Sequence, residues 1–213
     1  MEPVEFKSEN LILQGRLSRP GVSPPYLPAV IAHPHPLFGG SMDNNVVLAL
    51  RDQLLEMGYL VLRFNFRGVG KSRGSYGNFL GEAKDIISAC DYLFSLSETE
   101  NSRLVACGYS FGGLALLYAL AKGLSPRALV LVSPMVPEEG WERAGELKKI
   151  LPLKIPALIL LGERDDFFTS ELYQPLGIGQ EAVKFHLIPD ADHFFWGKEK
   201  ELVAPLKEFL AQL

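Results

Sequence analysis

The sequence predicts an α/β fold in which a mostly parallel central sheet of about eight strands carries helices on both faces. Apolar segments rich in β-branched residues alternate along the chain with segments of helical period. The segment Ala-Leu-Val-Leu-Val, at 128–132, is apolar at every position, as expected when helices cover both faces of a parallel sheet. The 213 residues contain no internal repeat, low-complexity tract or linker, so we expect a single domain spanning 1–213.

The first part of the chain supports this fold element by element. Two early segments with strand character lie close enough to pair as an antiparallel hairpin, and a Pro-rich turn at 20–28 precedes the third strand. From there each helix follows a strand, which is the order of βαβ units that join parallel strands. The predicted elements are strands at 4–7, 11–19 and 29–33, a helix at 44–57, a strand at 59–64, a helix at 82–96, a strand at 104–108, a helix at 112–122 and a strand at 128–133.

The second part of the chain continues the alternation. We expect a strand at 157–161, a short helix near Glu171, a strand at 183–188 and a closing helix from Lys198. The connection at 134–154 is long enough for one helix and too short for a large cap domain. In a sheet of this kind, functional residues collect in the loops that leave the carboxyl ends of the strands.

Composition excludes several classes of function. Lys and Arg number 21 against 25 Asp and Glu, a formal charge of −4, and there is no local basic patch, so we predict no nucleic-acid partner. The N-terminus lacks a secretory signal and no apolar run approaches the ~18 residues that span a bilayer, which predicts no membrane partner and a cytoplasmic location. Cys90 and Cys107 fall within a predicted helix and strand, so buried thiols are expected rather than a disulfide or a metal site.

The segment Gly-Tyr-Ser-Phe-Gly-Gly, at 108–113, follows a predicted strand and opens a helix. This is a G-x-S-x-G motif in a strand-turn-helix context, which is typical of a serine nucleophile. The glycines are needed because Ser110 must lie in a tight, strained turn, where side chains at positions 108 and 112 would collide. The turn also places a helix N-terminus beside Ser110, so we expect the amide of Phe111 to donate to a developing oxyanion.

A serine nucleophile needs a base, and the chain has four histidines. His186 lies inside a predicted strand and is expected to be structural. His33 and His35 precede Ser110 in the chain, whereas His193 lies just past the final strand. Only His193 combines a suitable loop with the order serine, acid, histidine, so it is the predicted base.

The base in turn needs a carboxylate that fixes its tautomer. The loop after the predicted strand Ala-Leu-Ile-Leu-Leu reads Gly-Glu-Arg-Asp-Asp and supplies three candidates. We favour Asp165 over Asp166 and Glu163, because one acid in such a loop usually orients the histidine while its neighbours form surface pairs. Asp190 and Asp192 are expected to act as turn formers beside the histidine.

The order and the loops together resemble the α/β-hydrolase family over nearly the whole chain. In that family the serine, the acid and the histidine follow successive strands, as Ser110, Asp165 and His193 do here, and the acid usually ends a G-x-x-D step such as the one at 162–165. The segment His-Pro-His-Pro-Leu-Phe-Gly-Gly, at 33–40, resembles a loop of small bacterial hydrolases related to dienelactone hydrolases. The resemblance implies a serine hydrolase, without cofactor or metal, that cleaves a small ester-type substrate through an acyl-enzyme intermediate.

The resemblance also implies that a main-chain amide in the loop at 33–40 completes an oxyanion hole. Pro34 and Pro36 have no amide hydrogen, so the donor is His35 or Leu37. We favour Leu37, because the Phe-Gly-Gly that follows lets the chain bend toward the serine. The segment at 64–72 resembles the family's loop after the fourth strand, which borders the site without reacting.

Other functions have weaker support in the sequence. A phosphate-binding loop at Gly-Lys-Ser would need glycine where Asn65 stands. His33 and His35 have a spacing that can hold a catalytic metal, which makes a metal-dependent hydrolase the main rival of a different class. A thioesterase, a lactonase or an acyl-peptide hydrolase would use the same triad, and a non-catalytic binding protein on this fold is the third class.

Aromatic residues gather in the loops on the predicted catalytic side. They predict an apolar acyl pocket, with core packing as the alternative role for each residue. With no lid, the site is expected to be open and to suit small soluble esters better than long lipids. The residues are Trp141, Phe167, Phe168, Phe194, Phe195 and Trp196.

Overall fold

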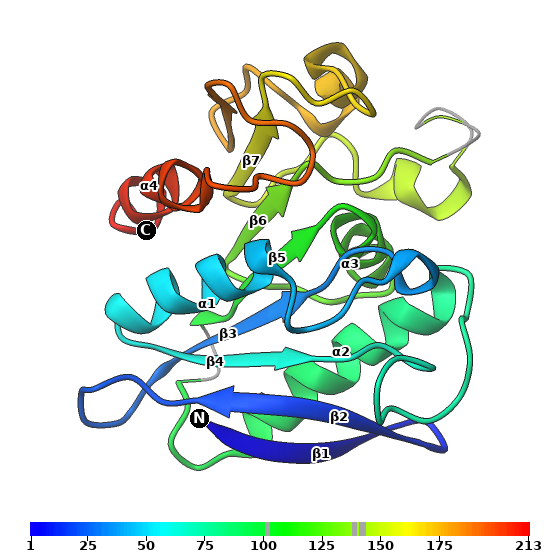
Figure 1. Cartoon of the computed structure of the whole chain (residues 1–213), viewed down its shortest axis with the longest axis vertical. Coiled ribbons are helices and arrows are strands. Elements are labelled where there is room, and N and C mark those ends of the chain that lie inside the picture. The colour runs from blue at the N-terminus through cyan, green and yellow to red at the C-terminus, as the bar shows by residue number, and fades with distance from the viewer. Residues whose placement is uncertain (101–102, 138–139, 141–143) are drawn as a thin grey trace.

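Eight strands form one sheet in the computed structural model, which describes residues 1–100, 103–137, 140 and 144–213. The strands are β1 (Glu2–Ser8), β2 (Leu11–Ser18), β3 (Leu27–Ala32), β4 (Tyr59–Phe64), β5 (Val105–Tyr109), β6 (Ala128–Val132), β7 (Ala157–Gly162) and β8 (Val183–Ile188). Their order across the sheet is β1-β2-β4-β3-β5-β6-β7-β8 (Figure 1). β2 runs antiparallel to β1 and β4, and the other adjacent strands are parallel. The predicted fold class, with its antiparallel N-terminal strand, is confirmed.

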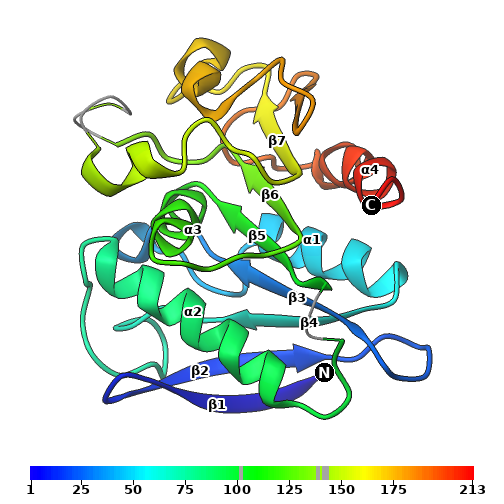
Figure 2. The same cartoon turned by 180° about the vertical axis from the view of Figure 1, so that it is seen from behind.

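Helices cover both faces of this sheet. In the described part of the chain the α-helices are α1 (Asn45–Glu56), α2 (Leu80–Ser95), α3 (Phe111–Ala121) and α4 (Glu199–Leu210). Figures 1 and 2, which view the molecule from opposite sides, show α1 and α4 on one face and α2 and α3 on the other. Along β6, Val130 and Val132 pack on the α1 side while Leu129 and Leu131 pack on the α2 side. The strand is apolar throughout because both of its faces are buried.

The connection between β6 and β7 holds no cap domain in its described residues, where the regular element is a 3-10 helix, η3 (Gly145–Lys149). Trp141, predicted as part of an acyl pocket, lies outside the described residues. The short helix expected near Glu171 is also a 3-10 helix, η4 (Ser170–Leu176), and Pro175 lies inside it. A proline in that position removes the hydrogen-bond donor that an α-helix would need.

Both cysteines lie in the core of the fold. Cys90 and Cys107 are buried and carry free thiols, as predicted from their places in a helix and a strand. Within the described ranges, no helix has the length and apolar character needed to cross a bilayer.

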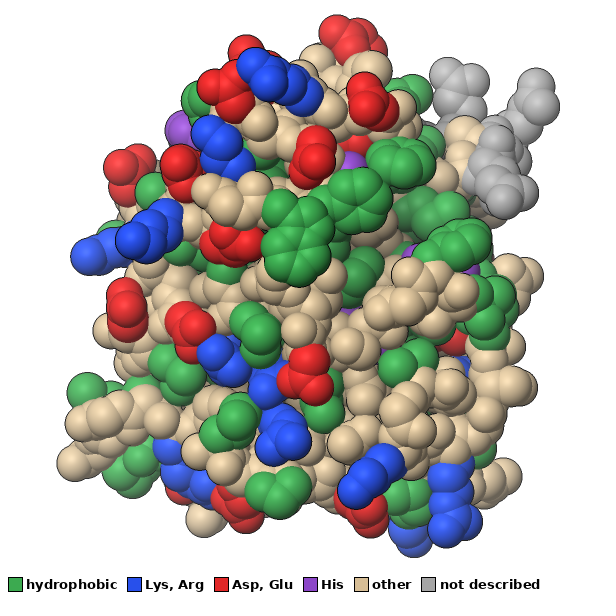
Figure 3. Space-filling model, in the orientation of Figure 1, with side chains coloured by type: hydrophobic (Ala, Val, Ile, Leu, Met, Phe, Trp, Pro, Cys, Tyr) green, Lys and Arg blue, Asp and Glu red, His purple; other side chains and the backbone are tan. Residues whose placement is uncertain are grey.

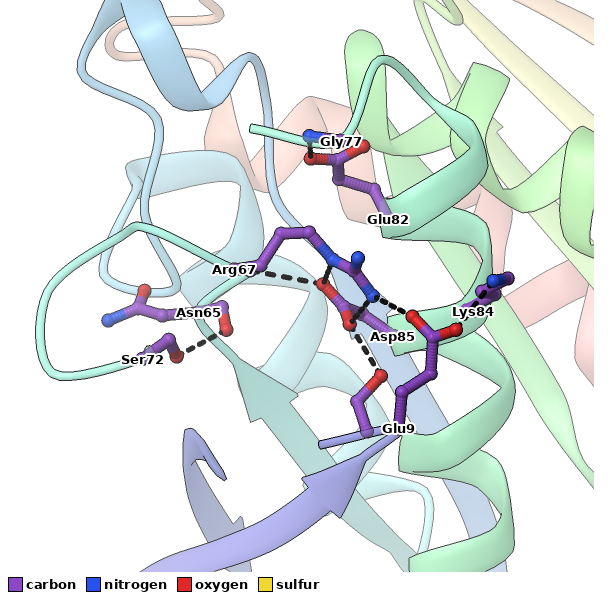
Figure 4. Close-up of polar contacts among 9 residues, drawn as sticks. Glu9, Asn65, Arg67, Ser72, Gly77, Glu82, Lys84 and Asp85 are labelled. Carbon is purple, nitrogen blue, oxygen red and sulfur yellow. Dashed lines mark hydrogen bonds and ion pairs between the residues drawn. The ribbon is translucent and has the colours of Figure 1, made fainter. Parts of the chain in front are cut away.

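A buried ion pair holds the loop between β4 and α2 against the rest of the fold (Figure 4). The carboxylate of Asp85 on α2 is fully buried, and it accepts hydrogen bonds of 2.8–3.0 Å from the main-chain amide and guanidinium of Arg67. The hydroxyl of Ser8 on β1 donates to the same carboxylate at 2.6 Å. Nearby, Glu82 accepts a hydrogen bond from the amide of Gly77 at 2.7 Å. These contacts fix both ends of the loop.

Candidate active site

Ser110 lies in a sharp turn between the end of β5 and the start of α3. Its φ of 52° and ψ of −116° fall outside the regions that residues with a Cβ favour, which is the strain expected of this turn. A Cβ on Gly108 would lie 2.6 Å from the carbonyl oxygen of Gly112. A Cβ on Gly112 would overlap the carbonyl oxygen of Ala32. Both positions therefore require glycine for steric reasons.

The structure brings Ser110, His193 and Asp165 into one chain of hydrogen bonds. Nε2 of His193 lies 3.1 Å from Oγ of Ser110, and Nδ1 lies 2.8 Å from Oδ2 of Asp165. Oδ1 of Asp165 accepts hydrogen bonds from the amides of Phe167 and Phe168, at 2.9 and 3.1 Å. With its proton on Nδ1, the neutral imidazole donates to Asp165 and leaves Nε2 free to accept from the serine hydroxyl.

Asp165 remains a carboxylate at neutral pH. Burial raises its pKa, but the hydrogen bond and charge of His193 and the amide of Phe167 together lower it more, so the pKa lies below the ordinary 3.8. The carboxylate is also held in place, because both of its oxygens accept hydrogen bonds. It can therefore orient the imidazole and stabilise its protonated form.

The other carboxylates considered from the sequence have different contacts. Asp166 is exposed. Glu163 accepts a hydrogen bond from the amide of Asp190 at 3.1 Å, at the surface. Asp192 accepts hydrogen bonds of 2.9 and 3.0 Å from two amides of its own turn, as expected of a turn former. In the described part of the chain, Asp165 is the carboxylate that bonds to the histidine.

Two side chains that were not predicted from the sequence hold the main chain around His193. The hydroxyl of Tyr109 donates to the carbonyl oxygen of His193 at 2.7 Å, and its buried ring lies 5.6 Å from the imidazole between centroids. The side-chain amide of Asn45 donates to the carbonyl oxygen of Phe194 at 2.9 Å. Tyr109 directly precedes the serine in the motif, but its partner is 84 residues away and no local pattern indicates the contact.

The loop at 33–40 reaches the site with His35 rather than Leu37. The amide of Leu37 donates to Nδ1 of His35 at 3.2 Å, and the Leu37 side chain is 64% exposed. His35 lines the cavity beside Ser110. No acceptor among the described residues pairs with the main-chain amides of His35 and Phe111. These two amides are thus available to a ligand, whereas the amide of Leu37 is engaged within its own loop.

The remaining histidines lie outside this chain of hydrogen bonds. His33 is fully buried at the end of β3, where its Nδ1 donates to the carbonyl of Pro34 at 2.6 Å and its Nε2 accepts from the amide of Phe66 at 3.0 Å. Burial lowers the pKa of His33 to about 4. Both ring nitrogens are therefore engaged with main-chain groups and are not free to ligate a metal with His35. His186 is exposed in β8, away from the strand ends.

A cavity of about 500 Å³ has Ser110 and His193 in its wall. Phe167, Phe168 and Phe194 of the predicted aromatic set line it. Their ring centroids lie 5.0, 5.5 and 5.7 Å from that of His193. The other two described members of that set do not line the cavity, since Phe195 is buried in the core and Trp196 is exposed outside. Hydrophobic side chains gather toward the upper right of Figure 3, with histidine atoms among them.

A protein-family model described as an alpha/beta hydrolase domain matches residues 29–208. The chain belongs to the α/β-hydrolase family. Among relatives of this α/β hydrolase, the uncharacterized protein RP471 of Rickettsia prowazekii (strain Madrid E) is 31% identical over 216 residues, which cover 99% of this chain and 89% of that protein. The uncharacterized protein YfhR of Escherichia coli (strain K12) is 28% identical over 182 residues, covering 78% of this chain and 63% of that protein.

Solved structures are similar over the whole fold. An alpha-beta serine hydrolase homologue from Coxiella burnetii has a TM-score of 0.82 and 28% identity, covering 100% of this chain and 97% of its own. A member of the a/b serine hydrolases without lid, from Xanthomonas campestris, has a TM-score of 0.84 and 26% identity, covering 99% of this chain and 94% of its own. The predicted family is confirmed, and the chain is a hydrolase of the α/β-hydrolase family.

Proposed function

We propose that this α/β hydrolase is a serine hydrolase that cleaves a small ester-type bond through an acyl-enzyme intermediate. The observation that carries the proposal is the hydrogen-bonded chain from Ser110 through His193 to Asp165, which borders a cavity large enough for a small substrate. The strained turn at Ser110 and the free amide of Phe111 supply the other parts of such a site.

The first half-reaction acylates the serine. Nε2 of His193 takes the hydroxyl proton of Ser110 as Oγ attacks the carbonyl carbon of the ester. The carbonyl oxygen becomes an oxyanion, and the tetrahedral intermediate then collapses with cleavage of the bond to the leaving group. His193 passes its proton to the departing alcohol. Asp165 holds the Nδ1 proton and stabilises the imidazolium while the proton resides on Nε2.

The second half-reaction releases the acid. Water, activated by Nε2 of His193, attacks the acyl carbon, and the resulting intermediate expels Oγ of Ser110, which recovers its proton from the imidazole. We assign the oxyanion hole in both steps to the amides of Phe111 and His35. His35 takes the place expected for Leu37, because the amide of Leu37 already bonds to the His35 ring.

Fluorophosphonate labelling tests the nucleophile directly. Intact mass is expected to show one adduct on the folded protein, and peptide mapping should place it on Ser110. Ser110→Ala is the control and should take up no label. Labelling at another residue, or none on folded protein, would overturn the assignment and favour a non-catalytic binding protein on this fold.

A series of p-nitrophenyl esters of graded chain length tests ester cleavage and measures the size of the acyl group accepted. The same triad can act on thioesters, lactones and acyl peptides, so a matched substrate of each type ranks the bonds by kcat/KM. Exhaustive chelation separates the proposal from a metal-dependent hydrolase. Activity should survive chelation; loss of activity that zinc or manganese restores would favour a metal centre at His33 and His35 instead.

A further inference from the structure

We infer that the cavity at Ser110 accepts an uncharged, apolar acyl group and discriminates against a substrate that carries a carboxylate on its acyl chain. This inference rests on the proposed function and names the class of substrate for it. The cavity lies within reach of the serine hydroxyl, so its chemical character decides which acyl groups are bound productively.

The described lining of the cavity contains no lysine or arginine. Apart from Ser110 and the two histidines, it consists of aromatic rings, proline, methionine, glycine and a single amide side chain, that of Asn44. The carboxamide oxygen of Asn44 is engaged as the N-cap of α1, where it accepts from the amide of Val46 at 2.9 Å. The wall therefore offers apolar contact and neutral polar groups, and no lysine or arginine that could pair with a carboxylate.

The charges next to the cavity have the wrong sign for an anion. Three charged side chains directly adjoin a lining residue in the chain, and all three are acidic: Asp166, Asp192 and Asp43, the last of which is paired with Arg63. Asp166 and Asp192 are exposed. They lie, in the chain, within two residues of the phenylalanines around His193, so their two loops bring negative rather than positive charge toward the site.

A carboxylate in this cavity would lose water without gaining a lysine or arginine as a partner. Burying an unpaired charge is strongly unfavourable, whereas burying a methyl group against aromatic rings is favourable. The α3 N-terminus does offer positive potential, but it lies at Ser110 itself, where the oxyanion of the scissile carbonyl forms. The site is therefore arranged to stabilise negative charge at the reacting carbonyl and to reject it further along the acyl chain.

A matched pair of substrates tests this inference. The p-nitrophenyl ester of pentanoic acid and the mono-p-nitrophenyl ester of glutaric acid share a leaving group and differ in a terminal methyl against a carboxylate. The methyl ester of the second compound restores neutrality at similar size. We expect kcat/KM for the two neutral substrates to exceed that for the anion by at least about tenfold, since the anion must be desolvated without a partner.

A gain-of-function variant makes the test specific to charge. Phe38 lines the cavity and is 85% exposed, so Phe38→Arg places a cation at the opening and gives up one ring contact, with His35 at 4.5 Å between centroids. This variant should raise kcat/KM for the glutarate and lower the preference for pentanoate. Trp196→Arg is the matched control, because Trp196 is 72% exposed on the loop after His193, does not line the cavity, and changes net charge equally. It should leave the preference unchanged.

The outcomes separate this inference from the proposed function. Equal kcat/KM for pentanoate and glutarate in the unaltered protein, or an equal shift in both arginine variants, would overturn the inference while ester cleavage stands. A protein that cleaves none of the three esters and takes no fluorophosphonate at Ser110 would instead overturn the proposed function.

Discussion

Replacing Tyr109 by Phe removes one hydroxyl and leaves the ring packed against His193 and Phe195. The carbonyl oxygen of His193 then loses a hydrogen bond of 2.7 Å in buried surroundings. An unpaired buried acceptor costs about 1–3 kcal/mol. When the turn relaxes so that this carbonyl oxygen reaches another donor, the imidazole moves relative to Ser110. A loss of ~1.4 kcal/mol in transition-state stabilisation lowers the rate tenfold. We therefore expect kcat to fall about tenfold with KM nearly unchanged, because the hydroxyl bonds to the main chain.

The assay compares this variant with Tyr173→Phe. Tyr173 is also buried and donates its hydroxyl to a main-chain carbonyl, that of Pro134, at 2.9 Å. Urea denaturation should show a similar loss in the free energy of unfolding for both variants. Only Tyr109→Phe should lose kcat and react more slowly with a fluorophosphonate. Equal kcat losses in the two variants, or no loss in Tyr109→Phe, would refute the idea that the hydroxyl positions the base.

Three other changes have defined outcomes. Asp165→Asn should lower kcat by about 10⁴, because the imidazole takes the wrong tautomer, while Asp166→Asn should have a mild effect; the reverse ranking would reassign the acid. Gly112→Ala should destabilise the fold by more than the ~1–3 kcal/mol of ordinary overpacking, since its Cβ meets main-chain atoms, and a variant of unchanged Tm would contradict the tight turn. Asp85→Ala should cost about 3–5 kcal/mol in urea denaturation, because Arg67 is then left with the partly exposed Glu9 as its ion-pair partner, and a loss under about 1 kcal/mol would mean that Glu9 or water replaces the carboxylate.

The contacts of Ser110, Asp165 and His193 follow from the alternation of strands and helices. Each of the three lies within five residues of the end of a strand, and the carboxyl ends of parallel strands meet at one edge of the sheet. The fold class and the family could therefore be predicted from pattern and motif, and both are confirmed. The catalytic roles of the three residues stay predictions, which the variants above test.

Other parts of the site depend on details that no sequence pattern carries. Whether the amide of His35 or that of Leu37 is free for a ligand depends on the orientation of the His35 ring. Nδ1 of this ring accepts a hydrogen bond from the amide of Leu37, whereas the amide of His35 has no acceptor among the described residues. The contacts of Tyr109 and Asn45 with the loop of His193 join residues 84 and 149 positions apart. Such partners are set by the register of the strands and the packing of α1, which are properties of the folded chain.

Asp85 ties together stretches that lie far apart in the chain, since it bonds to Ser8 on the outermost strand and to Arg67 after β4. Further along the same loop, the ring of Tyr76 stacks on that of His35 at 5.5 Å between centroids. β1 supplies none of the residues proposed for catalysis. Through Asp85 and the loop after β4, however, it is connected by a series of contacts to the loop proposed to bind the oxyanion. In protein engineering, β1 should therefore be treated as part of the structure that supports the proposed site. A deletion of residues 1–9 would remove the buried ring of Phe6 from the core as well as the hydroxyl of Ser8 from Asp85, so we expect it to lower both stability and turnover.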